Sequence, residues 1–159
     1  MRFENRVALI TGAGSGIGRV MAQRFAAEGA AVAVVDWKGE KADEVAREIG
    51  KAGGRAHAVR ADVSRGSEVK AMVAEVASKL GSVDVLVNNA AIADGDDVLK
   101  IDEPTWERDV SVVLKSVFLC SQAVLPSMIE RRGERSSTSR PSTASRRSAT
   151  RRTARPRPA

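Results

Sequence analysis

The chain contains no tyrosine, one cysteine (Cys120) and one histidine (His57) among its 159 residues. A single cysteine cannot form a disulfide within the chain. Neither Cys120 nor His57 has partners at the spacing of a metal site, so we expect no bound metal. We expect Cys120 to be a buried thiol on a helix face and His57 to lie in or beside a strand.

Long hydrophobic runs and a leader-like N-terminus are also missing. The uninterrupted apolar runs are far shorter than the roughly 20 residues of a membrane-spanning helix. The first residues do not combine basic, apolar and small residues in the way a secretion signal does. We therefore expect a soluble, cytoplasmic protein that does not associate with membranes.

The net charge of +6 is concentrated at one end of the chain. Residues 133–159 hold eight Arg and one Glu, which leaves residues 1–132 with a net charge of about −1. The same segment has no Val, Ile, Leu, Met, Phe, Trp or Cys, so it cannot bury enough apolar surface to offset the entropy of ordering it. We expect one domain, residues 1–132, followed by a disordered Arg/Ser/Thr/Pro-rich tail, residues 133–159.

Strand-like and helix-like apolar patterns alternate along residues 1–132. The strands are expected at residues 7–10, 31–35, 56–59 and 83–87. The helical segments between them are expected to end near glycines, at Gly29, at Gly50 or the Gly53-Gly54 pair, and at Gly81. Strands separated by helices of this length imply right-handed crossovers and a parallel sheet. The pattern therefore predicts an α/β fold.

Two expected helices carry apolar stripes, and because the rest of the fold is missing, we expect the stripe of the second to lack partners. The first is expected to use Ile17, Val20, Met21 and Phe25. A longer helical region is expected from Pro104 to Arg132, with Asp102 as its cap and a kink or interruption at Pro126. Its apolar face is expected to comprise Trp106, Val110, Val113, Leu114, Val117 and Phe118.

Residues Thr11 to Gly18 read T-G-A-G-S-G-I-G and connect the first strand directly to the following helix. Free backbone N–H groups and the positive helix end converge at such a turn, which favours a phosphate. Glycine permits the tight turn and the close approach of a ligand. The residues expected to wrap the pyrophosphate of a dinucleotide are Gly12, Ser15, Gly16, Ile17 and Gly18.

Asp36 stands at the end of the second strand, 18 residues after Gly18. A carboxylate there can accept hydrogen bonds from the adenosine ribose hydroxyls, and its charge repels a 2′-phosphate. No arginine replaces Ser15 or Trp37, so we expect NAD as the cofactor rather than NADP. Lys38 is the residue that favours NADP.

Four motifs follow the four expected strands in order. They are Thr11-Gly12-x-x-x-Gly16-x-Gly18, Asp36, Ala61-Asp62-Val63 and Asn88-Asn89-Ala90-Ala91. In order and spacing they resemble the short-chain dehydrogenase/reductase family over residues 5 to about 132, roughly the first half of such a domain. The resemblance implies a Rossmann-type doubly wound parallel sheet, truncated here after the fourth strand and the long fourth helix.

The resemblance also implies a function. Family members bind a nicotinamide dinucleotide and transfer hydride between it and an alcohol or carbonyl substrate, often as homo-oligomers. It implies that Asp62 approaches the adenine amino group, that Val63 packs on the base, and that Asn89 and Ala90 line the cofactor. Ala91 stands where the family usually has glycine. The substrate itself is not encoded in these residues.

The catalytic residues of the family are missing. They are an Asn on the long fourth helix, a Ser and a Tyr-x-x-x-Lys pair, whereas this chain has no Tyr and has Val113 at the Asn position. The tyrosine hydroxyl transfers the proton while the lysine and the cofactor ring lower its pKa. We therefore assign no catalytic residue and expect no useful rate of hydride transfer from the chain as written.

The tail suggests a change of reading frame. From Glu134 onward, codons permitted by the amino acids give AIVNVASVNGIAALGNEAYSAAKAG in the frame one base away. A serine codon straddles Arg140 and Pro141, a tyrosine codon straddles Arg152 and Thr153, and a lysine codon straddles Pro156 and Arg157. Because the Tyr-x-x-x-Lys spacing reappears, our hypothesis is that the tail is a frameshifted translation, real in the gene or introduced by a sequencing error.

Two alternatives remain open. The chain could be a non-catalytic dinucleotide-binding protein, or the tail could bind nucleic acid or an acidic partner through its arginines. The tail lacks the aromatic residues that stack on bases, which disfavours nucleic acid. Without a fifth strand, the row Val83, Val85 and Val87 would form an exposed edge. We expect poor solubility or aggregation for that reason.

Overall fold

The computed structural model describes residues 1–92 and 99–137, with side chains as far as Arg131. Most of the tail predicted to be disordered, residues 138–159, lies outside the described residues. The elements are β1 (Val7–Thr11), α1 (Gly16–Ala27), β2 (Ala31–Asp36), α2 (Gly39–Lys51), β3 (Arg55–Arg60), α3 (Gly66–Lys79), β4 (Val85–Val87), α4 (Glu103–Val110), a π-helical turn η1 (Ser111–Lys115) and α5 (Ser116–Ser137).

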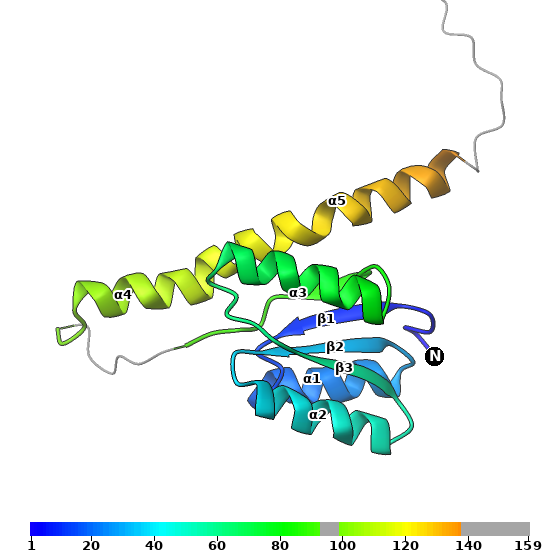
Figure 1. The fold of residues 1–159 in the computed structure, drawn as a ribbon, viewed down its shortest axis with the longest axis horizontal. Coiled ribbons are helices and arrows are strands. Elements are labelled where there is room, and N and C mark those ends of the chain that lie inside the picture. The colour runs from blue at the N-terminus through cyan, green and yellow to red at the C-terminus, as the bar shows by residue number, and fades with distance from the viewer. Residues whose placement is uncertain (93–98, 138–159) are drawn as a thin grey trace, which may run out of the picture.

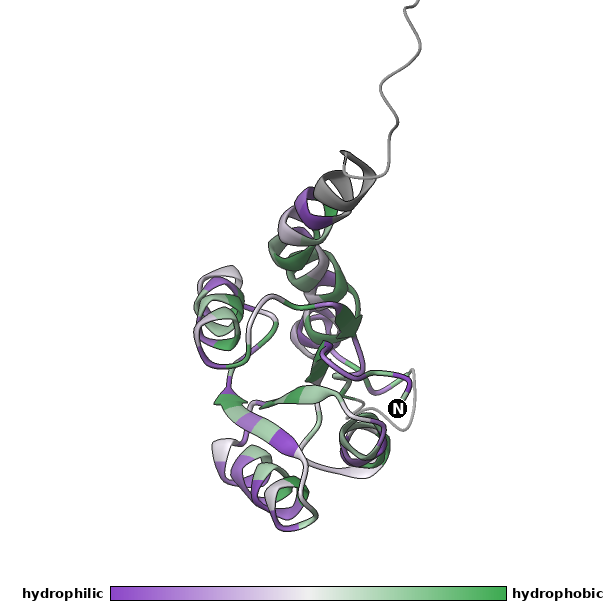
Figure 2. Cartoon of the chain, turned by 90° about the vertical axis from the view of Figure 1, so that its right-hand side faces the viewer, coloured by the Kyte–Doolittle hydropathy of each residue, from purple (hydrophilic) through white to green (hydrophobic). Residues whose placement is uncertain are grey.

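The strands form one parallel sheet in the order β3-β2-β1-β4. Helices α1 and α2 cover one face, and α3 and α5 cover the other (Figures 1 and 2). Parallel strands joined by helices are the doubly wound arrangement that the sequence predicts, so the fold class is confirmed. Helix α4 lies beyond the carboxyl ends of the strands (Figure 1).

Two apolar cores lie on the two faces of the sheet. Side chains alternate along a strand, so Leu9 and Ala33 contribute to the core under α3 and α5. Ala8 and Val32 contribute to the core under α1 and α2. Every residue of β1 and β2 is buried, as continuous apolar runs covered on both faces predict.

Helix α1 packs with a different face from the expected one. Ile17 and Val20 are 75% and 64% exposed, whereas Gly18, Ala22 and Ala26 are buried. The expected apolar stripe was therefore wrong at its first two positions. The helix lies so close to β1 that a Cβ on Gly18 would come within 2.2 Å of the Gly12 carbonyl oxygen, and only small residues fit at that contact.

The long helical region begins as predicted, because the Asp102 carboxylate accepts a hydrogen bond from the Thr105 N–H at 2.9 Å. It differs from the expectation at Pro126, where α5 continues without interruption to Ser137. The departure from α-helical geometry occurs earlier, in the π-helical turn η1. That turn contains Val113, and π-helical turns inside α-helices often occur at functional sites.

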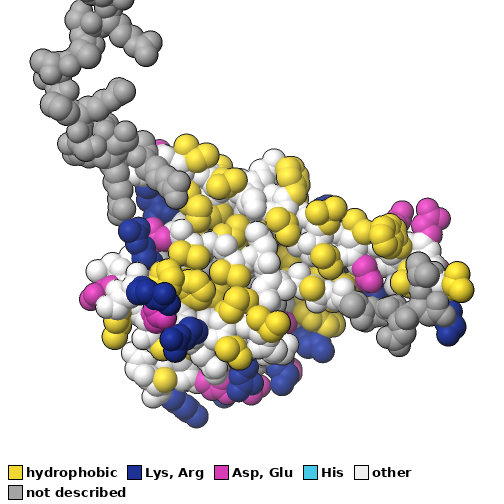
Figure 3. Space-filling view, turned by 180° about the vertical axis from the view of Figure 1, so that it is seen from behind, with side chains coloured by type: hydrophobic (Ala, Val, Ile, Leu, Met, Phe, Trp, Pro, Cys, Tyr) yellow, Lys and Arg dark blue, Asp and Glu magenta, His cyan; other side chains and the backbone are white. Residues whose placement is uncertain are grey.

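On the long helix, the apolar face that was predicted to lack partners is exposed, which confirms that expectation. The buried residues are Ser116, Cys120 and Val124, four positions apart, and Cys120 and Val124 belong to the core formed with α3 and the sheet. The exposed apolar residues are Trp106, Val113, Leu114, Val117, Phe118, Leu125 and Ile129. Apolar side chains gather over this helix and the neighbouring edge of the molecule in Figure 3.

The edge of the sheet is formed by β4, which is shorter than expected and pairs with β1 alone among the described strands. Val83 precedes the strand and is buried, which corrects the expected exposed row. Val85 and Val87 are half-buried. The low solubility expected from this edge stays a prediction.

The helical stretch Glu103–Arg131 is long and apolar enough in length and composition to cross a membrane. Only 17% of its most apolar window is buried. Core helices of water-soluble domains share this length and composition, and this helix packs on α3 through one face.

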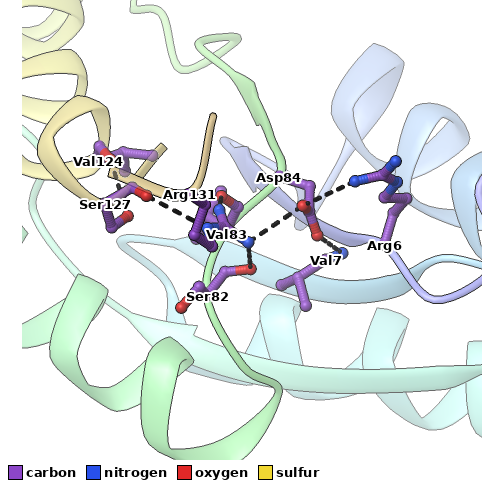
Figure 4. Close-up of polar contacts among 8 residues, drawn as sticks. All are labelled: Arg6, Val7, Ser82, Val83, Asp84, Val124, Ser127 and Arg131. Atoms are coloured by element: carbon purple, nitrogen blue, oxygen red, sulfur yellow. Dashed lines mark hydrogen bonds and ion pairs between the residues drawn. The ribbon is translucent and has the colours of Figure 1, made fainter. Parts of the chain in front are cut away.

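A polar cluster joins the end of α5 to the starts of β1 and β4 (Figure 4). The Arg131 guanidinium donates to the Ser82 and Val83 carbonyl oxygens and, at 3.1 Å, to the Asp84 carboxylate. Asp84 also accepts from the Val7 N–H at 2.9 Å and from Arg6 at 3.2 Å. One carboxylate therefore holds three segments that are far apart in the sequence.

Replacing this carboxylate should destabilise the protein. Asp84→Ala leaves the Val7 N–H and the Arg131 guanidinium without their acceptor, and we expect the free energy of unfolding to fall by about 2 kcal/mol. Urea denaturation followed by circular dichroism measures it. The exposed Asp43 on α2 is a matched control, and Asp43→Ala should change the value little. Equal effects of the two substitutions would contradict this account of the cluster.

Candidate functional site

The carboxyl ends of the strands border a cleft of about 800 Å³. Nine of the ten residues that the sequence singled out line it: Gly12, Ser15, Ile17, Gly18, Asp36, Asp62, Val63, Asn89 and Ala90. Gly16 lies in the same turn but does not line the cleft. Ligands of parallel α/β sheets bind at the carboxyl ends of the strands. The structure thus brings the predicted residues together, and their role in cofactor binding stays a prediction.

The glycine turn leads directly into the start of α1. Gly12 and Gly16 have positive φ angles of 63° and 53°, which favour glycine. A Cβ on Gly16 would meet nothing within 4 Å, so the space beside it is open. Ser15 is the N-cap residue, makes no capping side-chain hydrogen bond, and no acidic residue stands in the first turn. The first-turn N–H groups and the Ser15 hydroxyl therefore fit a pyrophosphate.

Asp36 is held rigidly at the end of β2. Its side chain accepts hydrogen bonds from the Gly14 N–H at 2.9 Å and from the Lys38 N–H at 3.0 Å. The residue is only 7% exposed and still lines the cleft. Asp36 therefore presents a fixed acceptor to a ligand in the cleft.

Two lysines lie beside this carboxylate. The Lys38 ammonium lies 4.9 Å from the centre of the Trp37 ring, and the Lys41 ammonium is 3.4 Å from Glu44. Both lysines and Trp37 line the cleft. This part of the cleft thus combines one buried carboxylate with two lysine ammonium groups on flexible side chains.

Asn89 has a structural task that the sequence did not reveal. Its side-chain nitrogen donates to the carbonyl oxygens of Thr11 and Gly12, at 3.0 and 3.2 Å. The Thr11 hydroxyl oxygen accepts from the backbone N–H groups of Asn89 and Ala90, at 3.0 and 3.1 Å. These bonds tie the end of β4 to the end of β1. In the sequence, only the position of Thr11 directly before the glycine turn could have indicated this structural role.

Asp62 follows β3 at the far end of the cleft. Partial burial raises the pKa of this carboxyl, but hydrogen bonds from the Ser64 hydroxyl and N–H and the charge of Arg65 outweigh it, so the pKa lies below its usual range. The carboxylate is therefore ionised at neutral pH and can accept a hydrogen bond from an amino group.

The helical side of the cleft was missed by the sequence analysis. Arg108 and Val112 line it from α4 and η1, across from the glycine turn. Val113, at the position of the family's asparagine, is 46% exposed and has no hydrogen-bonding group. Among the described residues of the lining, the titratable ones are Asp36, Lys38, Lys41, Asp62 and Arg108. Only Arg108 belongs to the helical side.

The remaining candidate residues lie away from the cleft. Within the described ranges, no group of three or more His, Cys, Asp or Glu is placed to hold a metal ion. Cys120 is fully buried on α5, and burial raises the pKa of its thiol to about 11. His57 lies in β3 with its Nε2 atom 2.8 Å from a Glu75 carboxylate oxygen.

Known proteins are similar to this chain in sequence and in fold. Residues 6–136 match the sequence model of a family described as short chain dehydrogenase. Over 133 residues the chain is 45% identical to a meso-2,3-butanediol dehydrogenase of Serratia marcescens, covering 84% of this chain and 52% of that enzyme.

Two solved structures extend the comparison. A 3-ketoacyl-(acyl-carrier-protein) reductase from Brucella melitensis, complexed with NADH, has a TM-score of 0.77 at 41% identity, covering 84% of this chain and 54% of that one. A metagenomic short-chain oxidoreductase in complex with NADP has a TM-score of 0.78 at 33% identity, covering 83% and 60%. The chain spans about half the length of the curated relatives it matches. Since the family match runs through all four strands and the long helix, this chain belongs to the short-chain dehydrogenase family of nicotinamide-dependent oxidoreductases.

Proposed function

We propose that residues 1–132 are the NAD-binding half of an oxidoreductase that acts on an alcohol or carbonyl substrate. The observation that carries the proposal is the meeting of the glycine turn and the buried Asp36 carboxylate in one cleft. When bound, the nicotinamide ring accepts or supplies the hydride. The residues of this chain bind and orient the nucleotide.

Each proposed contact follows from a group described above. The N–H groups at the start of α1 and the Ser15 hydroxyl would hold the pyrophosphate, because no side chain already caps them. Asp36 would accept hydrogen bonds from the adenosine ribose. Asp62 and Val63 would contact the adenine. Asn89 and Ala90 would line the cofactor while they hold the glycine turn in place.

NAD is the proposed cofactor. The solved relatives include one with NADH and one with NADP, so relatives alone do not decide the choice. A buried carboxylate fixed by two N–H groups cannot move away from a 2′-phosphate, and the repulsion between the two charges disfavours NADP. Lys38 and Lys41 reduce this repulsion without removing it.

Replacing Asp36 should weaken NAD binding and relax the choice of cofactor. We expect Asp36→Ser to raise the Kd for NAD about tenfold or more, since a hydrogen bond to a charged group contributes about 1.5–3 kcal/mol. NADP should then bind about as well as NAD, because Lys38 and Lys41 remain. Titration calorimetry with both dinucleotides measures the change. An unchanged ratio of the two Kd values would remove Asp36 from the proposed site.

We propose that the chain as written does not catalyse hydride transfer. The chain has no tyrosine, and the described lining holds no tyrosine–lysine pair that could pass a proton to a substrate. The intact enzyme would gain its serine, tyrosine and lysine from the other reading frame of the tail. The proposed substrate class is an alcohol and the carbonyl compound that forms when it is oxidised.

We further propose a cytoplasmic protein that forms homo-oligomers when intact. The apolar face of the long helix would then be covered by protein rather than by lipid. Lys115 stands near the middle of this helical stretch, where a charge is costly inside a bilayer. Nothing in the described residues favours nucleic acid over this assignment, and residues 138–159 of the arginine-rich tail lie outside them.

A non-catalytic dinucleotide-binding protein is the second candidate. The cleft favours it as strongly as it favours an enzyme half, because the cleft contains binding groups only. The two candidates differ in the coding DNA. An enzyme half requires codons after Arg132 that encode the serine, tyrosine and lysine in the shifted frame, whereas a binding protein does not.

A further inference from the structure

Gly14 differs from the other glycines of its turn. Its φ angle is not positive, unlike those of Gly12 and Gly16, so its backbone conformation does not require glycine. Its surroundings do. A Cβ on Gly14 would lie 2.7 Å from the Lys41 Cβ and 2.8 Å from the Asp36 Oδ2. Real Cβ atoms do not make such short contacts. The absence of a side chain on Gly14 is therefore what lets its backbone lie against both Lys41 and Asp36.

Three elements come together at Gly14: the glycine turn, the end of β2 and the first turn of α2. Lys41 carries its Cβ directly on the helix backbone and cannot turn it away. The Asp36 carboxylate is held in place by hydrogen bonds alone, so a new side chain would displace it, whereas relief of the Lys41 contact requires a small shift of α2. The Gly14 N–H also donates to Asp36 Oδ2 at 2.9 Å. Gly14 thus provides both the space and one of the two bonds that fix the carboxylate.

We propose that Gly14 determines nucleotide specificity by holding the Asp36 carboxylate in the orientation that receives the ribose 2′-hydroxyl. The proposal rests on the NAD binding proposed above. An ionised carboxylate has about four acceptor positions, and the N–H groups of Gly14 and Lys38 occupy two. Within the described part of the chain no other group donates to this carboxylate, so the remaining positions can receive the ribose hydroxyls. Gly14 is a positioning residue that acts through Asp36.

The charges around the site give the proposal a specific consequence. Lys38 and Lys41 line the cleft beside the carboxylate. If the carboxylate turns away, these two ammonium groups dominate the local charge, and a 2′-phosphate is no longer repelled. Displacement of Asp36 should therefore weaken recognition of the 2′-hydroxyl and improve the relative binding of NADP at the same time. General destabilisation of the fold would weaken all dinucleotides equally.

The test compares the Kd values of NAD, NADP and the 2′-deoxyadenosine analogue of NAD by titration calorimetry. In Gly14→Ala, the preference for NAD over the deoxy analogue should fall about tenfold. The control Gly50→Ala should keep the preference, because a Cβ there meets nothing within 4 Å. In an Asp36→Ala background, Gly14→Ala should change the preference no further. A Gly14→Ala protein that binds NAD with its preference intact overturns the proposal.

A second measurement does not depend on the folding of Gly14→Ala. Amide hydrogen exchange should show the Gly14 N–H protected in the unaltered chain and unprotected in Asp36→Ala. The neighbouring Ala13 N–H bonds to the Val35 carbonyl at 2.9 Å and should stay protected in both. Equal protection of Gly14 in both proteins overturns the anchoring role even if NAD binds. A folded, unaltered chain that binds no NAD overturns the proposed function, and the specificity role with it.

Discussion

Restoring the shifted reading frame from Glu134 onward should convert an inactive chain into a dehydrogenase. The restored segment supplies a serine, a tyrosine and a lysine, and general acid–base groups of this kind contribute about 10²–10⁴-fold to a rate. We expect the restored protein to reduce NAD with at least one member of a panel of alcohols. The chain as written should show no rate above background. The absorbance of NADH follows both reactions.

Two controls make this result specific. Replacing the tyrosine codon that straddles Arg152 and Thr153 with a phenylalanine codon should return the rate to background. Val113→Asn in the restored protein should raise the rate further, because it supplies the amide missing from the long helix. Coding DNA that does not encode the string from Glu134 in the shifted frame would end the frameshift hypothesis. Equal activity of the original chain would contradict the assignment of its missing groups.

Gly18→Ala should abolish NAD binding. Its Cβ would lie 2.2 Å from the Gly12 carbonyl oxygen and 2.6 Å from the Asn89 Nδ2, and the carbonyl belongs to the backbone. Helix α1 must therefore move away from β1, which carries the N–H groups of the turn out of place. Overpacking of this kind also costs about 1–3 kcal/mol of stability.

Titration calorimetry and thermal unfolding measure the two effects of Gly18→Ala. Gly50→Ala on α2 is the matched control, because the added Cβ meets open space. That control should bind NAD as the unaltered chain does. If Gly18→Ala kept the same Kd, the close packing of α1 on the glycine turn would not matter for binding.

The sequence was sufficient for the order of elements and the fold class, but not for the packed helix faces. Periodicity locates an apolar stripe without revealing how near the helix lies to the sheet. At α1, close approach to β1 selects Gly18 and Ala22, and Ile17 faces outward. On the long helix the contact uses Cys120 and Val124, which pack in one core with α3 and the sheet.

The candidate site was predicted well where motifs carry the signal. The glycine turn, Asp36, Asp62 and Asn89 reach one cleft because the carboxyl ends of parallel strands share an edge. Thr11 and Gly14 were missed, because their importance depends on partners 78 and 22 residues away. Contacts of this kind exist only in the folded chain.

Binding of NAD to the chain as written is the most direct test of this account. Titration calorimetry on the folded protein should show one NAD per chain, with NADP binding more weakly. A cooperative thermal unfolding transition that NAD shifts to higher temperature would accompany it. A protein that unfolds cooperatively yet gives no heat signal and no shift with NAD would contradict the proposed cofactor site.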